Sequence, residues 1–389
     1  MVLGIENRLV SAAAAWCLSS LGGTLFGFAD RAARQRRLRR AKRVDLLLAL
    51  LAARLSDLAY LDSPADVITG LRAPPLAQDI PGGLHLCHFR RQRPETGNRP
   101  DVHPQWLLAR GKLPTFGDRN AKASKGEALY LAFRGTSSTS DLIRDICVEP
   151  EAHKGRDGIV RQFHGGFLKG VRDDRELHNQ LRRALKDSKH QCSHLYIVGH
   201  SLGGSLAFTM AAAGLVPSEL HEGPITVVAL GAPPPIQQQQ DADGKESRNS
   251  NDSQEQDKPP VPPPRYLLVV NDCDVVPRLL GSPMPVATAA LLAQSASSKP
   301  LAAVTTRNLE IMETMQSYTH PKDTEAILLR EGGDGAKEVP SSARSAVLHW
   351  DQALSTNLVE QHMQYTRALE VAAALSEAWE DDASDLHTL

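Results

Sequence analysis

The chain has 389 residues, and its 44 Lys plus Arg nearly balance 45 Asp plus Glu, which leaves a net charge of −1. Hydrophobic residues make up 41% and charged residues 23%, as in a globular protein with a sizeable core, which excludes collagen-like and wholly disordered chains. The lack of a basic excess argues against a nucleic-acid-binding protein. Five scattered cysteines without a C-x-x-C pair argue against a disulfide scaffold or a metal site and favour a reducing compartment.

The N-terminal region joins an uncharged segment to a basic one. Residues 9–29 carry no charge and are just long enough to span a bilayer as a helix, although they are rich in Ala, Ser and Gly. Eight basic residues follow between Arg31 and Arg43. This order favours a membrane anchor whose C-terminal side is cytoplasmic. The alternatives are a plastid or mitochondrial targeting peptide and a buried helix with a solvated Arg face.

The remaining chain alternates between helical and strand patterns. Residues 44–60 place leucines along one side and predict a helix, and Pro and Gly then punctuate residues 64–83. Apolar runs predict strands at 84–90, 106–110, 128–134, 195–198, 225–230, 265–270 and 324–330. Several of these runs are apolar enough to be buried on both faces. The pattern predicts the α/β class, with a largely parallel central sheet flanked by helices.

Composition also marks the domain boundaries. Residues 236–264 have almost no apolar content and end in a Pro cluster, which predicts a disordered surface insert. Residues 352–379 are mostly helical in pattern, and residues 380–389 form a polar tail. We therefore expect one domain over residues 44–379 that contains the insert, after an anchoring or targeting segment at residues 1–43.

The sequence Gly-His-Ser-Leu-Gly at 199–203 fits the G-x-S-x-G nucleophile elbow. In this elbow the serine sits on a sharp turn between a strand and a helix, and small neighbours prevent clashes. The apolar run at 195–198 precedes the motif, and an Ala-rich helical pattern follows it. This context favours a catalytic role for Ser201 over an ordinary Gly-rich turn.

A serine hydrolase of this type needs an acid and then a histidine later in the chain. The predicted strand at 265–270 runs into Asp272 and Asp274, which are both candidates for the acid. The later histidines are His320, His349, His362 and, in the polar tail, His387. The order of residues excludes none of the first three.

The oxyanion hole needs one N–H after the nucleophile and a second from an early strand end. Leu202 follows Ser201 and can supply the first. Phe133-Arg134-Gly135-Thr136 closes a predicted strand and can supply the second, although the same pattern fits an ordinary strand end.

Six segments in order resemble the class 3 lipases, the fungal-lipase-like α/β-hydrolases. They are YLAFRGT (130–136), HGGF (164–167), GHSLGG (199–204), GAP (231–233), DVVPRL (274–279) and HMQY (362–365). The resemblance covers about residues 84 to 370. It is closer still to diacylglycerol lipases and their plant and algal relatives, because R-G-T leads into a run with Asp141 and Asp145 and the acid motif is D-V-V-P-R-L.

The resemblance implies a role for each matching residue. It makes Ser201 the nucleophile, Asp274 the acid and His362 the base, with His349 as the rival base. Thr136 and Leu202 would form the oxyanion hole. It also makes His164 structural and His200 a support of the elbow, and it implies no metal or other cofactor. Residues 138–148 match the position of a lid that opens at lipid surfaces, although a helix packed on the core explains them equally well.

The expected activity is hydrolysis of fatty-acyl esters in di- or triacylglycerol at a membrane or lipid-droplet surface, inside the cell. The alternatives within the same chemistry are a phospholipase A1 and a galactolipase. An alternative of another class is a non-catalytic, membrane-bound interaction protein that docks through residues 236–264. A serine peptidase on the same fold lacks support from the lipase-like motifs.

Overall fold

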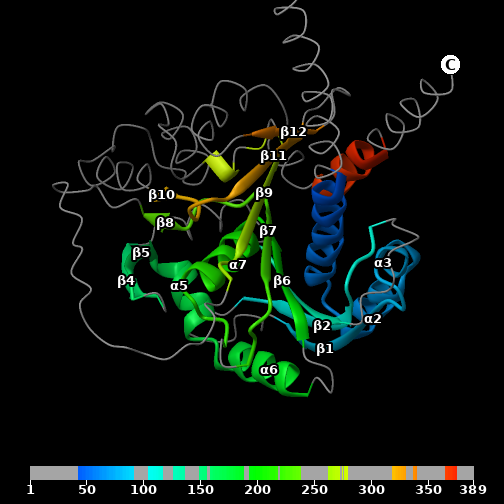
Figure 1. Ribbon diagram of the computed structural model, residues 1–389, viewed down its shortest axis with the longest axis horizontal. Helices are drawn as coiled ribbons and strands as arrows, with labels where there is room; N and C mark the ends of the chain where they lie inside the picture. The colour runs from blue at the N-terminus through cyan, green and yellow to red at the C-terminus, as the bar shows by residue number, and fades with distance from the viewer. Residues whose placement is uncertain are drawn as a thin grey trace, which may run out of the picture. The chain divides into compact units, whose positions relative to one another are not determined.

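The computed structural model describes residues 43–91, 104–116, 126–135, 149–155, 158–187, 192–217, 220–237, 262–271, 274, 276–278, 318–329, 336–339 and 364–374 (Figure 1). The chain divides into two compact units, Met1–Leu46 and Leu47–Leu389. The described part of the first unit is the start of a helix that covers residues 43–59. Everything below concerns the second unit.

An eight-stranded sheet with the order β1-β2-β3-β6-β7-β9-β11-β12 forms the centre of this unit. Its inner strands, β3, β6, β7, β9 and β11, run parallel to one another, and antiparallel strands complete both edges. The bounds are β1 Leu84–Arg90, β2 Trp106–Lys112, β3 Glu127–Phe133, β6 Cys192–His200, β7 Ile225–Leu230, β9 Arg265–Asn271, β11 Glu325–Leu329 and β12 Ala336–Val339.

Helices cover both faces of the sheet (Figure 1). On one side lie α5 (Gly165–Arg172) and α7 (Leu202–Ala212), and α6 (Arg175–Lys186) lies below them in this view. On the other side lie the helix at 47–59 and the helix at 365–374, which begins at Tyr365. Two short helices, α2 (Pro64–Arg72) and α3 (Pro74–Asp79), precede β1. The largest hydrophobic cluster joins alternate residues of the sheet to α5, α6 and α7.

A second sheet of four strands, in the order β10-β8-β5-β4, is antiparallel throughout. Its strands are β4 (Pro150–Lys154), β5 (Val160–His164), β8 (Ile236–Gln237) and β10 (Tyr318–Thr319). The sequence analysis does not predict this sheet. Two of its strands have only two residues, so pairing with neighbours decides their conformation, and no alternating pattern marks them in the sequence.

The predicted fold class is confirmed, because the central strands are parallel, buried and flanked by helices. The seven predicted strands are all present and differ by at most a few residues at their ends. The Pro- and Gly-rich stretch at 64–83 contains α2 and α3, which the sequence analysis treats only as punctuation. Proline starts each of these helices, where its missing N–H costs nothing.

Several predictions fall on residues outside the described ranges. Residues 1–42, 138–148, 238–261 and 380–389 are among them. The first two residues of the predicted insert, Ile236 and Gln237, form β8 and pair with β5 and β10. In the described part of the chain, no helix has the length and apolar character needed to cross a membrane.

Candidate active site

Ser201 lies at the sharp junction between β6 and α7. Its backbone has φ 57° and ψ −130°, a left-handed conformation that is rare for a residue with a side chain and costs about 1–3 kcal/mol. Two hydrogen bonds hold it there: Ser201 N–H donates to Leu230 O at 2.8 Å, and Gly204 N–H donates to Ser201 O at 3.0 Å. The turn predicted from the Gly-rich motif therefore has the strained backbone that a nucleophile elbow requires between strand and helix, and Ser201 is buried there.

The flanking glycines of the motif allow close backbone contacts. A Cβ atom on Gly199 would lie 2.3 Å from the carbonyl carbon of Gly203. A Cβ atom on Gly203 would lie 2.4 Å from the carbonyl oxygen of Phe133, at the end of β3. Any side chain at these two positions would push α7 away from the sheet. Close packing of the backbone at this turn therefore requires both glycines of the motif.

The strand end after β3 lies beside Ser201, because Phe133 pairs with Gly199 across the parallel strands. A Cβ atom on Gly135 would lie only 2.9 Å from Ser201 Cβ. Thr136, the next residue, lies outside the described ranges. Leu202 is the first residue of α7, where backbone N–H groups have no partner within the helix. The predicted donors thus come from two backbone segments that meet at the nucleophile.

Asp274 is fully buried after the end of β9, two strands away from β6. Its Oδ1 accepts a hydrogen bond from Val276 N–H at 2.9 Å. Its Oδ2 accepts one from the Tyr365 hydroxyl at 2.6 Å. The other predicted candidate, Asp272, lies outside the described ranges.

Tyr365 links the acid to the C-terminal helix. Its hydroxyl also accepts a hydrogen bond from Asn271 N–H at 3.0 Å, so it joins the end of β9 to Asp274. Gly231, with φ 56°, lacks a side chain and so makes space for this contact. A Cβ atom there would lie 2.6 Å from Asp274 Oδ2 and 2.8 Å from the Tyr365 oxygen. The sequence analysis assigns no role to Tyr365 or Gly231, although both belong to the motifs HMQY and GAP that it singles out.

The three candidate histidines differ in what the structure places around them. His362 and His349 lie outside the described ranges. In the sequence His362 is three positions before Tyr365, the residue that contacts Asp274. His320 is described: its ring is buried, and its Nε2 lies 3.2 Å from Ala232 O. This contact gives His320 a structural partner on the backbone after β7.

His164 and His200 occupy structural positions. His164 is the N-cap of α5, and its Nδ1 lies 3.4 Å from Phe167 N–H. The ring of His164 also stacks on Phe167 at a centroid distance of 3.9 Å. His200 ends β6, and its Nδ1 lies 3.0 Å from the Tyr60 hydroxyl. Both arrangements agree with the structural roles predicted for these residues.

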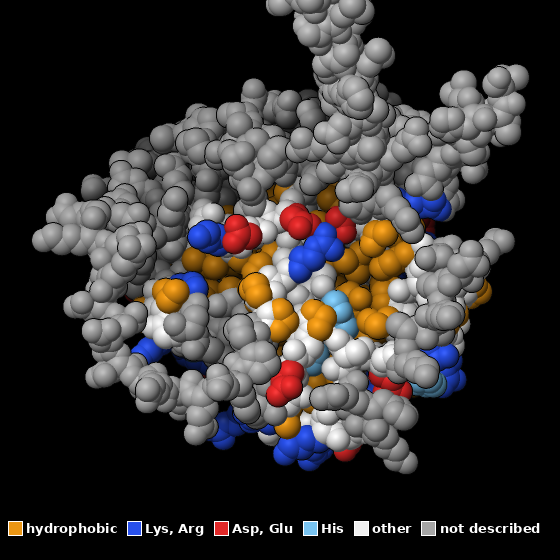
Figure 2. Space-filling model, in the orientation of Figure 1, with side chains coloured by type: hydrophobic (Ala, Val, Ile, Leu, Met, Phe, Trp, Pro, Cys, Tyr) orange, Lys and Arg blue, Asp and Glu red, His pale blue; other side chains and the backbone are white. Residues whose placement is uncertain are grey.

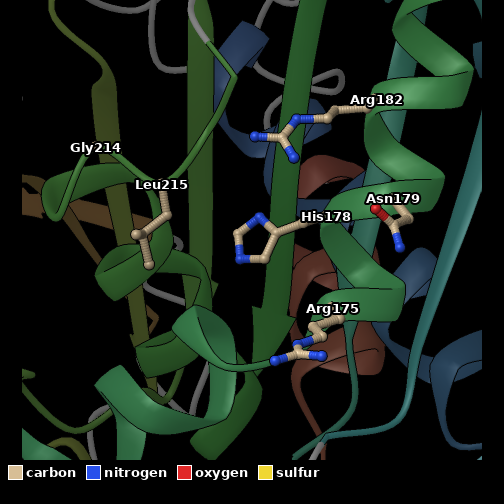
Figure 3. Close-up of a pocket in the computed structure, with 6 residues that line it drawn as sticks. All are labelled: Arg175, His178, Asn179, Arg182, Gly214 and Leu215. Atoms are coloured by element: carbon tan, nitrogen blue, oxygen red, sulfur yellow. The ribbon is translucent and has the colours of Figure 1, made fainter.

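A surface pocket of about 400 Å³ lies elsewhere on the molecule. In Figure 3, Arg175, His178 and Arg182 extend from α6 toward Leu215, and the remaining lining residues are Asn179 and Gly214. Gly214 follows the C-terminal end of α7, whereas Ser201 caps the N-terminal end of that helix. A helix of 11 residues is about 16 Å long, so the pocket is separate from the candidate active site.

The charges of the described surface are mixed. On the face seen in Figure 2, Lys, Arg, Asp and Glu side chains lie among hydrophobic ones, and basic side chains gather at the lower edge, where α6 lies in Figure 1. Among the residues that the structure describes, no group of three or more His, Cys, Asp or Glu side chains could hold a metal ion. The candidate catalytic side chains within the described residues are the Ser201 hydroxyl and the Asp274 carboxylate.

Residues 130–284, which include the elbow and Asp274, match the family Lipase (class 3). Over this span the chain is similar to the class 3 lipase family. The fold is that of an α/β-hydrolase, and a class 3 lipase is a carboxylic ester hydrolase that acts on lipids. No curated protein sequence matches the chain significantly.

Solved lipase structures share the arrangement at low identity. A propeptide complex of Rhizomucor miehei lipase is 16% identical, with a TM-score of 0.47, over 83% of this chain and 78% of that chain. The Lip2 lipase of Yarrowia lipolytica is 17% identical, with a TM-score of 0.46, over 82% of this chain and 92% of that chain.

Proposed function

We propose that this chain is a class 3 lipase that hydrolyses fatty-acyl esters of di- or triacylglycerol through Ser201, Asp274 and His362. The observation that carries the proposal is the left-handed backbone of Ser201 at the junction of β6 and α7. A serine held at φ 57° in a Gly-rich elbow is the arrangement that a nucleophile of this fold requires. The buried carboxylate of Asp274, at the same edge of the sheet, supports the same chemistry.

The first half of the reaction forms an acyl-enzyme. His362 removes the proton from Ser201 Oγ, which attacks the carbonyl carbon of the ester. The backbone N–H groups of Thr136 and Leu202 stabilise the negative oxygen of the tetrahedral intermediate. The intermediate then collapses, and the glyceride alcohol leaves with the proton carried by His362.

The second half releases the fatty acid. His362 activates a water molecule that attacks the acyl-enzyme, and the proton returns to Ser201 Oγ as the carboxylic acid departs. Asp274 fixes the tautomer of His362 and stabilises its protonated form. The bonds from Tyr365 and Val276 to Asp274 hold the carboxylate in one orientation, which supports its assignment as the acid of the triad.

We also propose that the N-terminal region brings the enzyme to its substrate. The uncharged segment at 9–29 and the basic residues after it are the supporting features. Each basic side chain close to an anionic membrane contributes about 1 kcal/mol to binding. The resemblance to diacylglycerol lipases and their plant and algal relatives supports a membrane glycerolipid as the substrate.

The test compares the purified full chain with Ser201→Ala on three substrates: a soluble short-chain ester, dispersed diacylglycerol and phospholipid vesicles. We expect fatty acid release by the unaltered chain only, with diacylglycerol as the preferred lipid. Preference for phospholipid would instead identify a phospholipase A1. If both proteins are folded and equally inactive on all three substrates, a non-catalytic interaction protein becomes the better interpretation.

A matched pair of variants tests the base. His362→Ala is expected to lower kcat on the soluble ester by at least about 10⁴-fold, as loss of a triad member does. His349→Ala is the control and is expected to leave kcat within about twofold. The reverse result would assign the base to His349 and leave the hydrolase activity itself in place.

A further inference from the structure

Tyr60 lies directly after the helix at 47–59, far from the site in sequence, yet its hydroxyl lies between the two backbone segments that meet at Ser201. The hydroxyl is 3.0 Å from Nδ1 of His200, the residue before the nucleophile. It also packs against the backbone of Gly135, the residue before Thr136. One phenol therefore contacts both strand ends of the candidate site.

The three groups pack closely. A Cβ atom on Gly135 would lie 2.4 Å from the Tyr60 oxygen, 2.4 Å from the His200 carbonyl oxygen and 2.9 Å from Ser201 Cβ. The Tyr60 hydroxyl, Gly135 after the end of β3, and His200 at the end of β6 are therefore in direct contact.

Tyr60 is itself held from two directions. Gln105 is buried, and its Nε2 donates to Ala59 O and Leu61 O, both at 2.7 Å, on either side of Tyr60. Arg134 donates from Nη1 to Gln105 Oε1 at 3.0 Å. The Arg134 guanidinium also lies 5.3 Å from the centroid of the Tyr60 ring, within the range of a cation–π contact. The position of the phenol is therefore determined by its surroundings.

The hydroxyl is protonated at neutral pH, because burial raises the pKa of Tyr60. It shares a hydrogen bond of 3.0 Å with His200 Nδ1. Replacing the hydroxyl by a hydrogen therefore removes this bond and the packing of the oxygen against Gly135.

We propose that Tyr60 is a positioning residue for the proposed oxyanion hole: its hydroxyl holds Gly135 and His200, the described residues that lead toward the two proposed donors. The inference rests on the proposed function. Gly135 directly precedes Thr136, and His200 is two residues before Leu202, so the contact controls the backbone immediately ahead of each donor. Tyr60 does not touch the substrate and acts through these two segments.

The test uses Tyr60→Phe in the full chain, which keeps the ring and its contact with Arg134 and removes only the hydroxyl. On a soluble short-chain ester we expect kcat to fall by about tenfold, which is less than the 10²–10³-fold cost of losing an oxyanion donor outright. KM should stay within about twofold, because ground-state binding does not use the hole. Affinity for a trifluoromethyl ketone, whose serine adduct places an oxyanion in the hole, should fall by the same factor as kcat/KM.

Tyr130→Phe is the matched control. The Tyr130 hydroxyl is also buried and donates to Lys112 O at 2.6 Å, at the opposite end of β3. This variant loses one buried hydrogen bond, so it should lose stability while keeping kcat and inhibitor affinity. An equal fall of kcat in Tyr130→Phe would show that general destabilisation explains both results and would overturn the proposal.

His200→Leu provides a second, independent variant, since it removes the hydrogen-bond partner of the hydroxyl and leaves Tyr60 intact. If the two groups act as one unit, the double variant Tyr60→Phe/His200→Leu loses no more kcat than the more affected single variant. Unchanged kcat and inhibitor affinity in Tyr60→Phe, with activity still dependent on Ser201, would overturn this inference alone. Wild-type activity that survives Ser201→Ala would overturn the proposed function and this inference together.

Discussion

At the scale of single residues, the acid side of the site depends on one phenol. Tyr365 donates to Asp274 at 2.6 Å and accepts from Asn271 N–H at 3.0 Å. All three groups are buried, so water cannot replace the hydroxyl if it is removed. The contact therefore affects both the stability of the fold and the orientation of the carboxylate.

We expect Tyr365→Phe to lower the free energy of unfolding by about 1.5–3 kcal/mol, the range for a hydrogen bond to a charged group. We expect kcat on a soluble ester to fall by about three- to thirtyfold, well below the roughly 10⁴-fold effect of disturbing the bond between acid and histidine. Urea unfolding and steady-state kinetics measure the two effects.

Tyr318→Phe is the control for that experiment. The Tyr318 hydroxyl is buried without a hydrogen-bond partner among the described residues. Removing it should leave stability unchanged or raise it slightly, because an unsatisfied polar group is removed. A loss of more than about 1 kcal/mol in Tyr318→Phe would mean that the hydroxyl has a partner and that the comparison does not isolate the acid contact.

His194 should make stability depend on pH. Burial lowers its pKa from 6.5 to about 4, and its Nε2 shares a hydrogen bond of 2.8 Å with Thr226. Between these values the unfolded chain binds a proton that the folded chain does not. Stability is therefore lost as the pH falls from about 6.5 toward 4, by at most about 1.4 kcal/mol per pH unit.

Urea unfolding from pH 7 to pH 4.5 measures this slope, and His194→Gln should reduce it. Some slope should remain in the variant, because burial also lowers the pKa of His221. Identical slopes in the two proteins would show that His194 titrates alike in the folded and unfolded chains.

At the scale of elements, two helix N-caps illustrate how burial changes the contribution of a capping side chain to stability. Asp174 caps α6 by accepting from Leu177 N–H at 3.0 Å. It also accepts from Trp106 Nε1 at 2.9 Å and pairs with Arg90 at 2.7 Å, while its side chain is 1% exposed. Ser63 caps α2 with one exposed bond, from Ala65 N–H at 3.2 Å.

We expect Asp174→Ala to cost about 3–5 kcal/mol, because it leaves the Arg90 charge partly buried without this carboxylate. Ser63→Ala should cost about 1 kcal/mol, the usual value for an exposed cap. Asp174→Asn should fall between them, since it keeps the cap and removes the charge. Equal losses in the two alanine variants by urea unfolding would contradict this ranking.

At the scale of the whole unit, the parallel strands bring distant segments to one edge. Gly135, Ser201, Gly231 and Asp274 follow β3, β6, β7 and β9, which are neighbours in the sheet. The carboxyl edge of a parallel sheet is where ligand sites form in folds of this class. Segments of the chain that do not contribute to this edge are therefore expected to tolerate changes in length and sequence without loss of stability.

Residues 238–261 offer a test of that tolerance. We expect their replacement by a Gly/Ser linker of about 12 residues to change stability by less than about 1 kcal/mol, since loop entropy varies slowly with length. Thermal unfolding of the two proteins measures the difference. A fall in Tm of more than about 8 °C would indicate that the segment contributes to the folded structure.

Much of the site can be predicted from the sequence where a local pattern carries it. The turn at Ser201 and the candidate acid Asp274 each follow a recognisable apolar strand. Tyr365 lies within a recognised motif, but its bond to Asp274 spans 91 residues and appears only in the fold. The contact between Tyr60 and His200 spans 140 residues and has no local signal at all.

The helices and strands also differ in how far a local sequence pattern predicts them. Strand β7 matches its predicted range because an apolar run alone defines it, and strand β1 also has the predicted bounds. Helix α6 carries a clear amphipathic pattern, with Leu177, Leu181 and Leu185 buried, that the sequence analysis does not use. Strand β8 could not be predicted, because its two residues become a strand only through their partners on either side.

The left-handed backbone at Ser201 has a consequence for how this chain can evolve. Glycine would adopt φ 57° without the penalty of a side chain, so Ser201→Gly should stabilise the fold by about 1 kcal/mol. Folding alone thus favours the loss of the hydroxyl, and only the reaction opposes that drift. In a lineage released from selection for catalysis, position 201 is where glycine should appear first, while the buried Tyr365 and Asp174 persist because the fold itself needs them.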